Sequence, residues 1–291
     1  MNLSSCTLCP HRCGVDRSRT RGFCRAGDRL RINLWQPHHG EEPAISGTRG
    51  SGTIFFSHCA MRCLYCQNHR ISHLGWGRDY SIGQLAEIML ELQDSGVHNL
   101  NLVTPGHFTP LIRQALELAR RTGLNLPVVW NSGGYEAAET LRTMEGLVDI
   151  YLPDFRYGDA AAGRRYSGVA DYPARAGEAI LEMFRQVGHL AIDDSGLARR
   201  GLLVRLLVLP GNVNRLDLVL AWLADHLGPE TWISLMAQYY PTHRAVDLPP
   251  LDRPLTTTEY ETMADLAEEL GFANGFLQEV ATSPEWTPDF K

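Results

Sequence analysis

The chain alternates between short apolar runs and amphipathic segments from residue 51 onward, and this alternation most constrains its fold. Six apolar runs occur in order, and a segment with helical periodicity follows each of them. In the first such segment, Leu85, Ile88, Met89 and Leu92 recur on one helical face, and Gly96 follows as a stop. The predicted strands cover residues 53–57, 99–103, 126–130, 147–152, 201–211 and 231–238. The predicted helices cover residues 84–95, 110–122, 135–144, 173–187, 215–227 and 258–270.

Six strand–helix units in a row predict an α/β fold with parallel strands and right-handed crossovers. The strand cores are continuous apolar runs, as in sheets that are covered on both faces. Two arrangements fit this pattern, a doubly wound open sheet and a barrel-like (β/α)6 sheet. Periodicity alone does not choose between them.

Composition and charge narrow the class of protein. The 291 residues are enough for one large domain or two small ones, and 21% charged residues are ordinary for a globular enzyme. The net charge of −6 gives no electrostatic reason to expect nucleic acid or a membrane as the main partner. No apolar run is long enough to span a membrane, and the N-terminus has no apolar signal segment. We therefore expect a cytoplasmic protein.

All seven cysteines lie in the first 66 residues, divided into a group of four and a group of three. In a reducing compartment such groups more often bind metals or clusters than form disulfides. We predict that residues 1–50 form a small cysteine-rich module and residues 51–291 the α/β body. The group of four has the spacing CxxCxxxC-x10-C and consists of Cys6, Cys9, Cys13 and Cys24. Four thiolates suit either a tetrahedral zinc ion or a second iron–sulfur cluster.

The group of three has the spacing CxxxCxxC and follows the first predicted strand directly. It consists of Cys59, Cys63 and Cys66. In a parallel sheet, functional groups gather at the carboxyl ends of the strands. Three thiolates can ligate three irons of a [4Fe–4S] cluster, which leaves the fourth iron open for a small chelating molecule. A zinc knuckle or three reduced buried thiols are the structural alternatives.

The segment CAMRCLYC resembles the signature of the radical S-adenosylmethionine (SAM) superfamily. The resemblance implies that the open iron binds the amino and carboxylate groups of SAM. It also implies reductive cleavage of SAM to a 5′-deoxyadenosyl radical that abstracts hydrogen from a substrate. Tyr65, before the third cysteine, is similar to the aromatic residue that approaches the adenine in that superfamily.

Polar residues at the other strand ends are the expected SAM contacts. VTPGHFTP follows the second strand where the superfamily has a Gly-Gly-Glu-like motif, so that Thr104, Gly106 and His107 take its place. Asn131 and Ser132 follow the third strand and can hydrogen-bond a ribose. Asp154 follows the fourth strand, although it could instead cap a helix, and His107 could be structural. Arg205 lies inside an apolar strand and requires either a carboxylate partner or the SAM carboxylate.

Taken together, the motifs are similar to a subgroup of radical SAM proteins related to the pyruvate formate-lyase activating enzyme. They run in order from CTLCPHRCGVDRSRTRGFC through YLPDFRY to SLMAQYYP. The resemblance implies a partial (β/α)6 TIM-like barrel and radical SAM chemistry, but it does not supply a substrate. The candidates are a protein or peptide, such as a glycyl radical enzyme, and a small molecule. The expected electron donor is a one-electron reductant such as flavodoxin or ferredoxin. The alternatives are a non-catalytic iron–sulfur electron-transfer or scaffold protein and an enzyme that modifies nucleic acid.

Overall fold

The computed structural model describes residues 3–280 and residue 290. Its strands are β1 (Leu30–His38), β2 (Ser51–Phe56), β3 (Arg78–Tyr80), β4 (Leu100–Val103), β5 (Val128–Ser132), β6 (Ile150–Pro153), β7 (Ala191–Ile192), β8 (Ala198–Leu207), β9 (Trp232–Met236) and β10 (Gly275–Leu277). Its α-helices are α1 (Pro43–Ser46), α2 (His69–Ser72), α3 (Ile82–Asp94), α4 (Thr109–Arg121), α5 (Ala138–Arg142), α6 (Ala160–Ser167), α7 (Tyr172–Val187), α8 (Leu216–Leu227) and α9 (Thr257–Glu269). Four 3-10 turns accompany them: η1 (Leu3–Ser5), η2 (Gly106–Phe108), η3 (Pro210–Asn212) and η4 (Ala245–Asp247).

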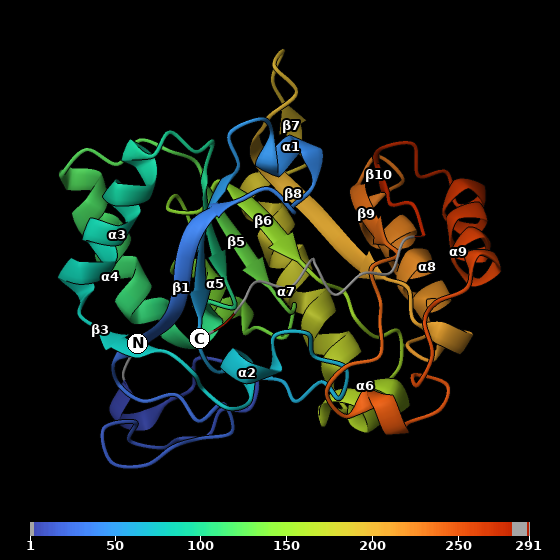
Figure 1. Ribbon diagram of the computed structural model, residues 1–291, viewed down its shortest axis with the longest axis horizontal. Helices are drawn as coiled ribbons and strands as arrows, with labels where there is room; N and C mark the ends of the chain where they lie inside the picture. Colours follow the sequence, from blue (N-terminus) through green and yellow to red (C-terminus); the bar gives the residue numbers. More distant parts are fainter. Residues whose placement is uncertain (1–2, 281–289, 291) are drawn as a thin grey trace.

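The described strands form one sheet in the order β10-β9-β8-β6-β5-β4-β2-β1-β3, with β7 paired to β8. From β2 to β10 all neighbours on this path are parallel, and they follow each other in chain order. In a doubly wound sheet the order of the strands reverses partway across the sheet. Because the order here does not reverse, the arrangement is the barrel-like one. Because β3 and β10 are the two ends of the path, the barrel is partial. The predicted fold class is confirmed, and the longer helices α3, α4, α7, α8 and α9 lie around the outside of the sheet (Figure 1).

Strand β1 crosses the predicted boundary between module and body. It lies within residues 1–50 yet pairs antiparallel with β2 from Ile32 to His38, and with β3 from Leu30 to Ile32. The sheet thus begins before the first predicted strand. The division of the chain at residue 50 stays a prediction.

The predicted helices are present with small shifts of their ends. Helix α3 begins at a capping box, in which the Ser81 hydroxyl accepts a hydrogen bond from the Gln84 N–H and the Gln84 side chain accepts one from the Ser81 N–H. Helix α5 is shorter than the predicted 135–144 because residues 133–137 form the turn that follows β5. Helix α6 was not predicted, since Gly163 interrupts its short apolar pattern.

The inner face of the sheet is apolar at one end and polar at the other. Val129, Ile150, Leu152 and Leu203 form a buried cluster with Ala44 and Ile45 of α1. Because successive strand residues alternate between faces, Asn131, Asp154 and Arg205 share this inner face nearer the carboxyl ends of their strands. The apolar cluster therefore forms the floor beneath a polar site. Among the described helices, none is long and apolar enough to cross a membrane.

Candidate functional site

The three-cysteine loop leaves β2 at its carboxyl end. His58 has a φ of 74°, a left-handed conformation that turns the chain out of the strand, and its N–H donates to the Ile71 carbonyl at 2.8 Å. The loop then carries Cys59, Cys63 and Cys66, all with free thiols. The loop ends at the short helix α2, so all three sulfurs belong to one short loop.

Hydrogen-bond donors surround the three sulfurs. The Met61 N–H donates to the Cys59 Sγ at 3.4 Å, and the Ser167 hydroxyl donates to the Cys63 Sγ at 2.9 Å. The Arg156 guanidinium lies 3.8 Å from the same Cys63 Sγ, and the Ser72 hydroxyl lies 3.1 Å from the Cys66 Sγ. Donors of this kind stabilise thiolates, which are the form of cysteine that binds iron.

Without a metal the loop disfavours thiolates. Burial raises the pKa of Cys59 to about 12 and that of Cys66 to about 11, and the neighbouring thiols add to both shifts. A bound cation would reverse this effect, because a coordinated thiol is deprotonated. Among the described residues, no group of three or more His, Cys, Asp or Glu side chains is arranged to hold a metal ion. A structural zinc site has four protein ligands, whereas this loop offers three cysteines.

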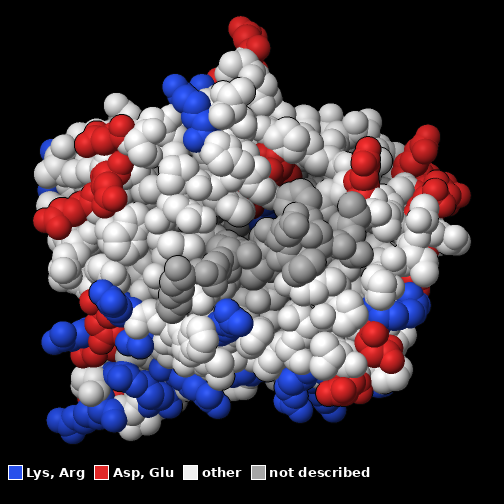
Figure 2. All heavy atoms as spheres, in the orientation of Figure 1, with Lys and Arg blue, Asp and Glu red and all other residues white. Residues whose placement is uncertain are grey.

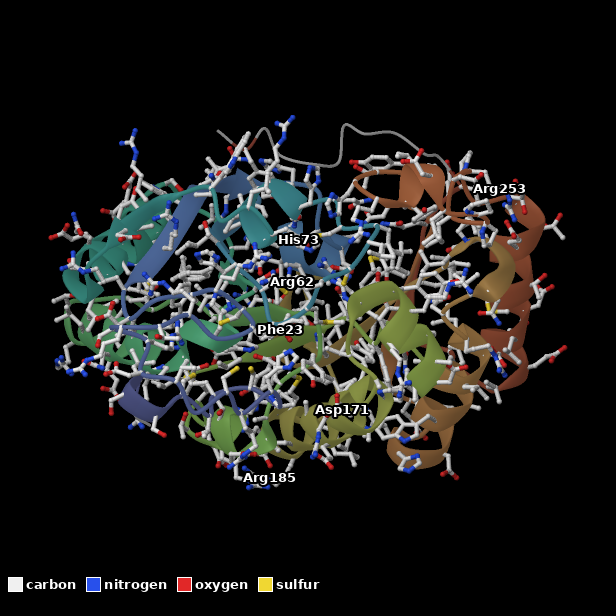
Figure 3. The ribbon with its side chains drawn as sticks, turned by 90° about the horizontal axis from the view of Figure 1, so that it is seen from below. Phe23, Arg62, His73, Asp171, Arg185 and Arg253 are labelled. Carbon is white, nitrogen blue, oxygen red and sulfur yellow. The ribbon has the colours of Figure 1, made fainter. Side chains whose placement is uncertain are left out.

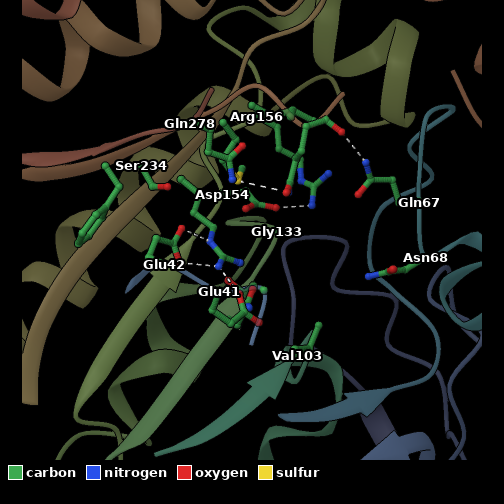
Figure 4. A pocket seen from close by; sticks show the side chains of 18 of the residues that line it. Glu41, Glu42, Gln67, Asn68, Val103, Gly133, Asp154, Arg156, Ser234 and Gln278 are labelled. Carbon is green, nitrogen blue, oxygen red and sulfur yellow. Dashed lines mark hydrogen bonds and ion pairs between the residues drawn. The ribbon is translucent and has the colours of Figure 1, made fainter. Parts of the chain in front are cut away.

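A cavity of about 610 Å³ opens beside this loop at the carboxyl ends of the strands (Figure 4). Cys66 and Tyr65 line it from the loop, and Thr104, Ser132 and Gln238 line it from the ends of three strands. In Figure 4, Gln67 and Asn68 lie on the loop side, and Glu41 and Glu42 lie across from them. The volume is in the range of small-molecule sites, and the lining is mostly polar.

Arg205 is held by two carboxylates inside the cavity wall. Its Nε donates to the Glu42 carboxylate at 2.8 Å and its Nη2 at 2.6 Å, and the Nη2 also donates to Glu41. Asn101 donates to the second Glu41 oxygen at 2.8 Å. Burial raises the pKa of Glu42, but the charge of Arg205 and the hydrogen bonds that the carboxylate accepts together outweigh this, so the net pKa is lowered. The three side chains form a buried charged triad that joins the segment after β1 to β8.

A second ion pair lies between the triad and the cysteine loop. The Asp154 carboxylate accepts a hydrogen bond from Arg156, whose Nη1 reaches Cys63. Tyr172 fixes the backbone here, because its hydroxyl donates to the carbonyls of Gly133 and Asp154 at 2.9 and 2.8 Å. The Arg156 Nε and the Asn214 Oδ1 are buried and find no hydrogen-bond partner among the described residues. Unpaired polar atoms in a cavity wall fit a polar ligand such as SAM.

Comparison with known proteins identifies the relatives of this chain. The chain is 32% identical to the uncharacterized protein MJ0674 of Methanocaldococcus jannaschii over 277 residues, which cover 92% of this chain and 75% of that protein. The chain belongs to the MJ0674 family. It is also 22% identical to the uncharacterized protein MJ0808 of the same organism, over 93% of this chain and 80% of that protein.

The chain was also compared with family models and with solved structures. A family model described as a 4Fe-4S single cluster domain matches residues 46–155, which include the three-cysteine loop. The fold is similar to that of a radical SAM methyltransferase from Sphaerobacter thermophilus, with a TM-score of 0.54 and 14% identity over 80% of this chain and 67% of that one. It is also similar to HydG, a maturase of the [FeFe]-hydrogenase, with a TM-score of 0.52 and 14% identity over 84% of this chain and 55% of that one. The two solved structures share the fold of this chain, and the family model matches a 4Fe-4S single cluster domain over the part of the chain that carries Cys59, Cys63 and Cys66.

In this member of the MJ0674 family, most of the predicted SAM contacts lie together. The cavity is lined by Tyr65, Thr104, Asn131, Ser132, Asp154 and Arg205. Asp154 caps none of the described helices, and the nearest cap, at α6, is Asp159. Arg205 has carboxylate partners of its own, which is the first of the two alternatives that its position left open. Its contact with SAM stays a prediction.

Gly106 and His107 do not line this cavity. They line a smaller one of about 30 Å³, together with Cys9 and Cys59. The His107 Nε2 lies 2.8 Å from the Ser57 carbonyl, and burial lowers the pKa of His107 to about 3. A side chain at Gly106 would place its Cβ 2.2 Å from the Glu136 carboxylate. Both residues thus pack the loop after β4, and their contact with SAM stays a prediction.

The N-terminal cysteines gather in one place. Burial raises the pKa of Cys9 to about 12, and the thiols of Cys24, Cys13 and Cys6 are near enough to raise it further. The Phe23 N–H donates to the Cys13 Sγ at 3.4 Å. Because Cys9 and Cys59 line the same small cavity, the group of four adjoins the group of three.

Sequence reasoning did not identify Glu41, Glu42 and Arg156 as site residues. The two glutamates lie in the expected N-terminal module, and they reach the cavity only because β1 joins the sheet. Two adjacent acids in an otherwise arginine-rich segment were the available signal. Arg156 lies in the motif YLPDFRY, two residues from Asp154. Its signal in the sequence was a charged residue shortly after a predicted strand.

Proposed function

We propose that this chain is a radical SAM enzyme in which Cys59, Cys63 and Cys66 hold a [4Fe–4S] cluster and the 610 Å³ cavity receives SAM. The observation that carries the proposal is that one loop bears all three cysteines, and its Cys66 lies in the cavity wall. Three thiolates leave one iron for a ligand, and the cavity is where that ligand would lie. The 4Fe-4S model over residues 46–155 supports the same reading.

When bound, the cluster would supply the one electron that cleaves SAM to methionine and a 5′-deoxyadenosyl radical, which takes a hydrogen atom from the substrate. The residues of this chain hold and enclose the reactants. Arg156 places a positive charge beside the Cys63 sulfur and offsets the charge of the thiolates. Asn131 and Ser132 offer hydrogen bonds to a ribose, and the group of Glu41, Glu42 and Arg205 keeps one uncompensated negative charge in the wall for a cationic ligand. The apolar floor below them excludes water from one side.

The test is SAM cleavage in the absence of substrate. The anaerobically reconstituted protein is incubated with dithionite and SAM, and 5′-deoxyadenosine is measured by mass spectrometry. We expect 5′-deoxyadenosine to form and to be lost in Cys66→Ala, since only two protein ligands then remain. Ala60→Ser, on the same loop, is the control and should retain activity. A wild type that is loaded with iron and sulfide but forms no 5′-deoxyadenosine would contradict the proposal and favour an electron-transfer role.

We further propose that the substrate is a protein or peptide, as for the activating-enzyme subgroup that the motifs resemble. The electron donor in this proposal is flavodoxin or ferredoxin in the cytoplasm. The measurement is EPR of a candidate glycyl radical enzyme after incubation with the reduced protein and SAM. A glycyl radical signal that requires both would support this substrate class, and 5′-deoxyadenosine formation without any such signal would point to another.

We also propose that Cys6, Cys9, Cys13 and Cys24 bind a metal centre. Their mutual proximity supports this, and all four have free thiols. The two forms are a second iron–sulfur cluster and a zinc ion. Metal analysis of a Cys59→Ala, Cys63→Ala, Cys66→Ala variant separates them. Retained iron and sulfide would assign a cluster, retained zinc would assign zinc, and loss of both would contradict the proposal.

A further inference from the structure

The N-terminal segment and helix α2 form a positively charged face on an otherwise acidic molecule. Residues 12–31 hold seven arginines against two aspartates, a net charge of +5, whereas the whole chain carries −6. Blue side chains gather along the lower edge of Figure 2, most densely at the lower left, where the N-terminal segment lies in Figure 1. Charge separated in this way steers an oppositely charged partner toward one face.

This basic face has a hollow of its own. A cavity of about 440 Å³ has four arginines and two aspartates in its lining, so its charge is positive on balance; the lining includes Arg21, Arg25, Arg29, Arg31, Asp28, Asp79, His58 and Leu74. Arg31 is fixed by its Nε, which donates to the Gly75 carbonyl at 2.7 Å, and by Asp79 at 2.8 Å. Arg25 and Arg29 are exposed. Four guanidinium groups around one hollow are a site for negatively charged groups.

Apolar side chains are exposed within the same face. Leu74 is 61% exposed and Trp76 is 41% exposed, both in the loop after α2. The Arg70 guanidinium lies over the Trp76 ring at 5.4 Å from its centroid. An exposed aromatic and a leucine rimmed by arginines have the composition of a protein interface, in which Trp and Arg are the most frequent binding hot spots.

The face borders the three-cysteine loop. His58, which lines the basic hollow, directly precedes Cys59. Arg62 lies between Cys59 and Cys63, and its Nη2 donates to the Phe23 carbonyl at 2.6 Å. Figure 3 shows Arg62 between Phe23 and His73 on this underside. Among the described residues, none that lines the basic hollow also lines the SAM cavity, so a partner on this face would leave that cavity open.

We propose that this basic face, which comprises Arg21, Arg25, Arg29, Arg70, Leu74 and Trp76, is the docking surface for an acidic one-electron carrier protein. The proposal rests on the proposed function, because that reaction consumes one electron per SAM cleaved. One electron passes from the reduced carrier to the cluster next to the face, so that the carrier is oxidised by one electron and the cluster is reduced by one. A carrier with an acidic surface is complementary in charge to this face.

The primary test is binding, which does not depend on activity. Oxidised flavodoxin is titrated into the anaerobic holoprotein by calorimetry at low ionic strength. The variant Arg25→Glu with Arg29→Glu reverses two exposed charges of the face. The matched control, Arg49→Glu with Arg121→Glu, changes the net charge equally at the opposite ends of the strands, just before β2 and at the last residue of α4. We expect Kd to rise about tenfold or more in the face variant and less than about twofold in the control. An equal change in both variants, or none, would overturn the proposal.

Two further measurements separate this proposal from its alternatives. Reduction of the cluster by flavodoxin should slow in the face variant, whereas reduction by dithionite, a small molecule, should not change. If dithionite fails to support SAM cleavage even in the wild type, the proposed function fails, and the binding result still stands on its own. If a short single-stranded RNA competes with flavodoxin and binds more tightly, the face belongs to nucleic acid and the proposal is overturned.

Discussion

At the scale of single residues, the Arg205 triad is the feature that joins the candidate site to the stability of the fold. The Arg205 side chain is 12% exposed, and those of Glu41 and Glu42 are 8% and 6% exposed. Removing one member of a buried charged group leaves the others uncompensated, which is costly even where the complete group adds little stability. The triad should therefore behave as a unit.

Arg205→Met tests this coupling. We expect the free energy of unfolding to fall by about 3–5 kcal/mol, because two buried carboxylates lose their partner. Urea unfolding measures the change. Adding Glu41→Gln and Glu42→Gln should restore part of the lost stability, since the uncompensated charges are then gone. A fall below about 1 kcal/mol, the value for an exposed ion pair, would show that the triad is not buried in solution.

A second residue-scale prediction concerns Glu136. Burial raises its pKa from the ordinary 4.5 to about 7, although the Trp130 indole N–H donates to both of its oxygens at 3.1 Å. The folded protein then keeps a proton that the unfolded chain releases above pH 4.5. The stability associated with this proton is fully present below pH 4.5 and is lost as the pH rises through about 7.

Glu136→Gln removes this titration. Between about pH 4.5 and pH 7 the free energy of unfolding of the wild type should fall by about 3 kcal/mol relative to the variant. The measurement is urea unfolding of both proteins at a series of pH values. Parallel curves across this range would mean that Glu136 is not buried as a neutral acid.

At the scale of elements, the turn after β5 positions the site. Gly134 has a φ of 75°, and a Cβ on it would lie 2.4 Å from the Asp154 carbonyl oxygen and 3.1 Å from the Tyr172 hydroxyl. The turn thus approaches the end of β6 too closely for any side chain. This packing holds Asp154 at the rim of the cavity.

Gly134→Ala should lower the free energy of unfolding by more than the cost of its left-handed backbone conformation. Gly146 is a matched control, because its φ is 78° and no atom lies within 4 Å of its added Cβ. We expect Gly146→Ala to lower the free energy of unfolding by about 1–2 kcal/mol, the cost of the left-handed conformation. Gly134→Ala should cost at least about 2 kcal/mol more, because the backbone of Asp154 must move. Equal losses in the two variants would show that the close approach is absent.

Elements also show what the sequence could and could not predict. The six strand–helix units were predictable because continuous apolar runs and 3.6-residue periodicity persist in each of them. Strand β1 was not, since its residues LRINLWQPH are mixed in polarity, as befits a strand buried only at one end. Glu42, which follows this strand, is 163 residues away from its ion-pair partner Arg205. The sequence showed that Arg205 required a partner, but only the topology could show which one.

At the scale of the whole molecule, the three-cysteine loop adjoins both the basic face and the polar cavity. The basic face borders the three-cysteine loop, and the loop borders the polar cavity at the strand ends. The group of four cysteines adjoins the same loop from the N-terminal side. Spacing alone predicted both cysteine groups, whereas their adjacency depends on how the N-terminal segment packs against the loops after β2 and β4. In our account, an electron enters at one side of the loop and SAM at the other.

The most direct test of this account is the EPR spectrum of the dithionite-reduced protein with and without SAM, recorded under anaerobic conditions. We predict a reduced [4Fe–4S] signal that changes shape when SAM is added, because SAM becomes a ligand of the iron without a cysteine. That signal should be absent when Cys59, Cys63 and Cys66 are all replaced by alanine. A fully loaded, reduced cluster whose spectrum is the same with and without SAM would contradict the account.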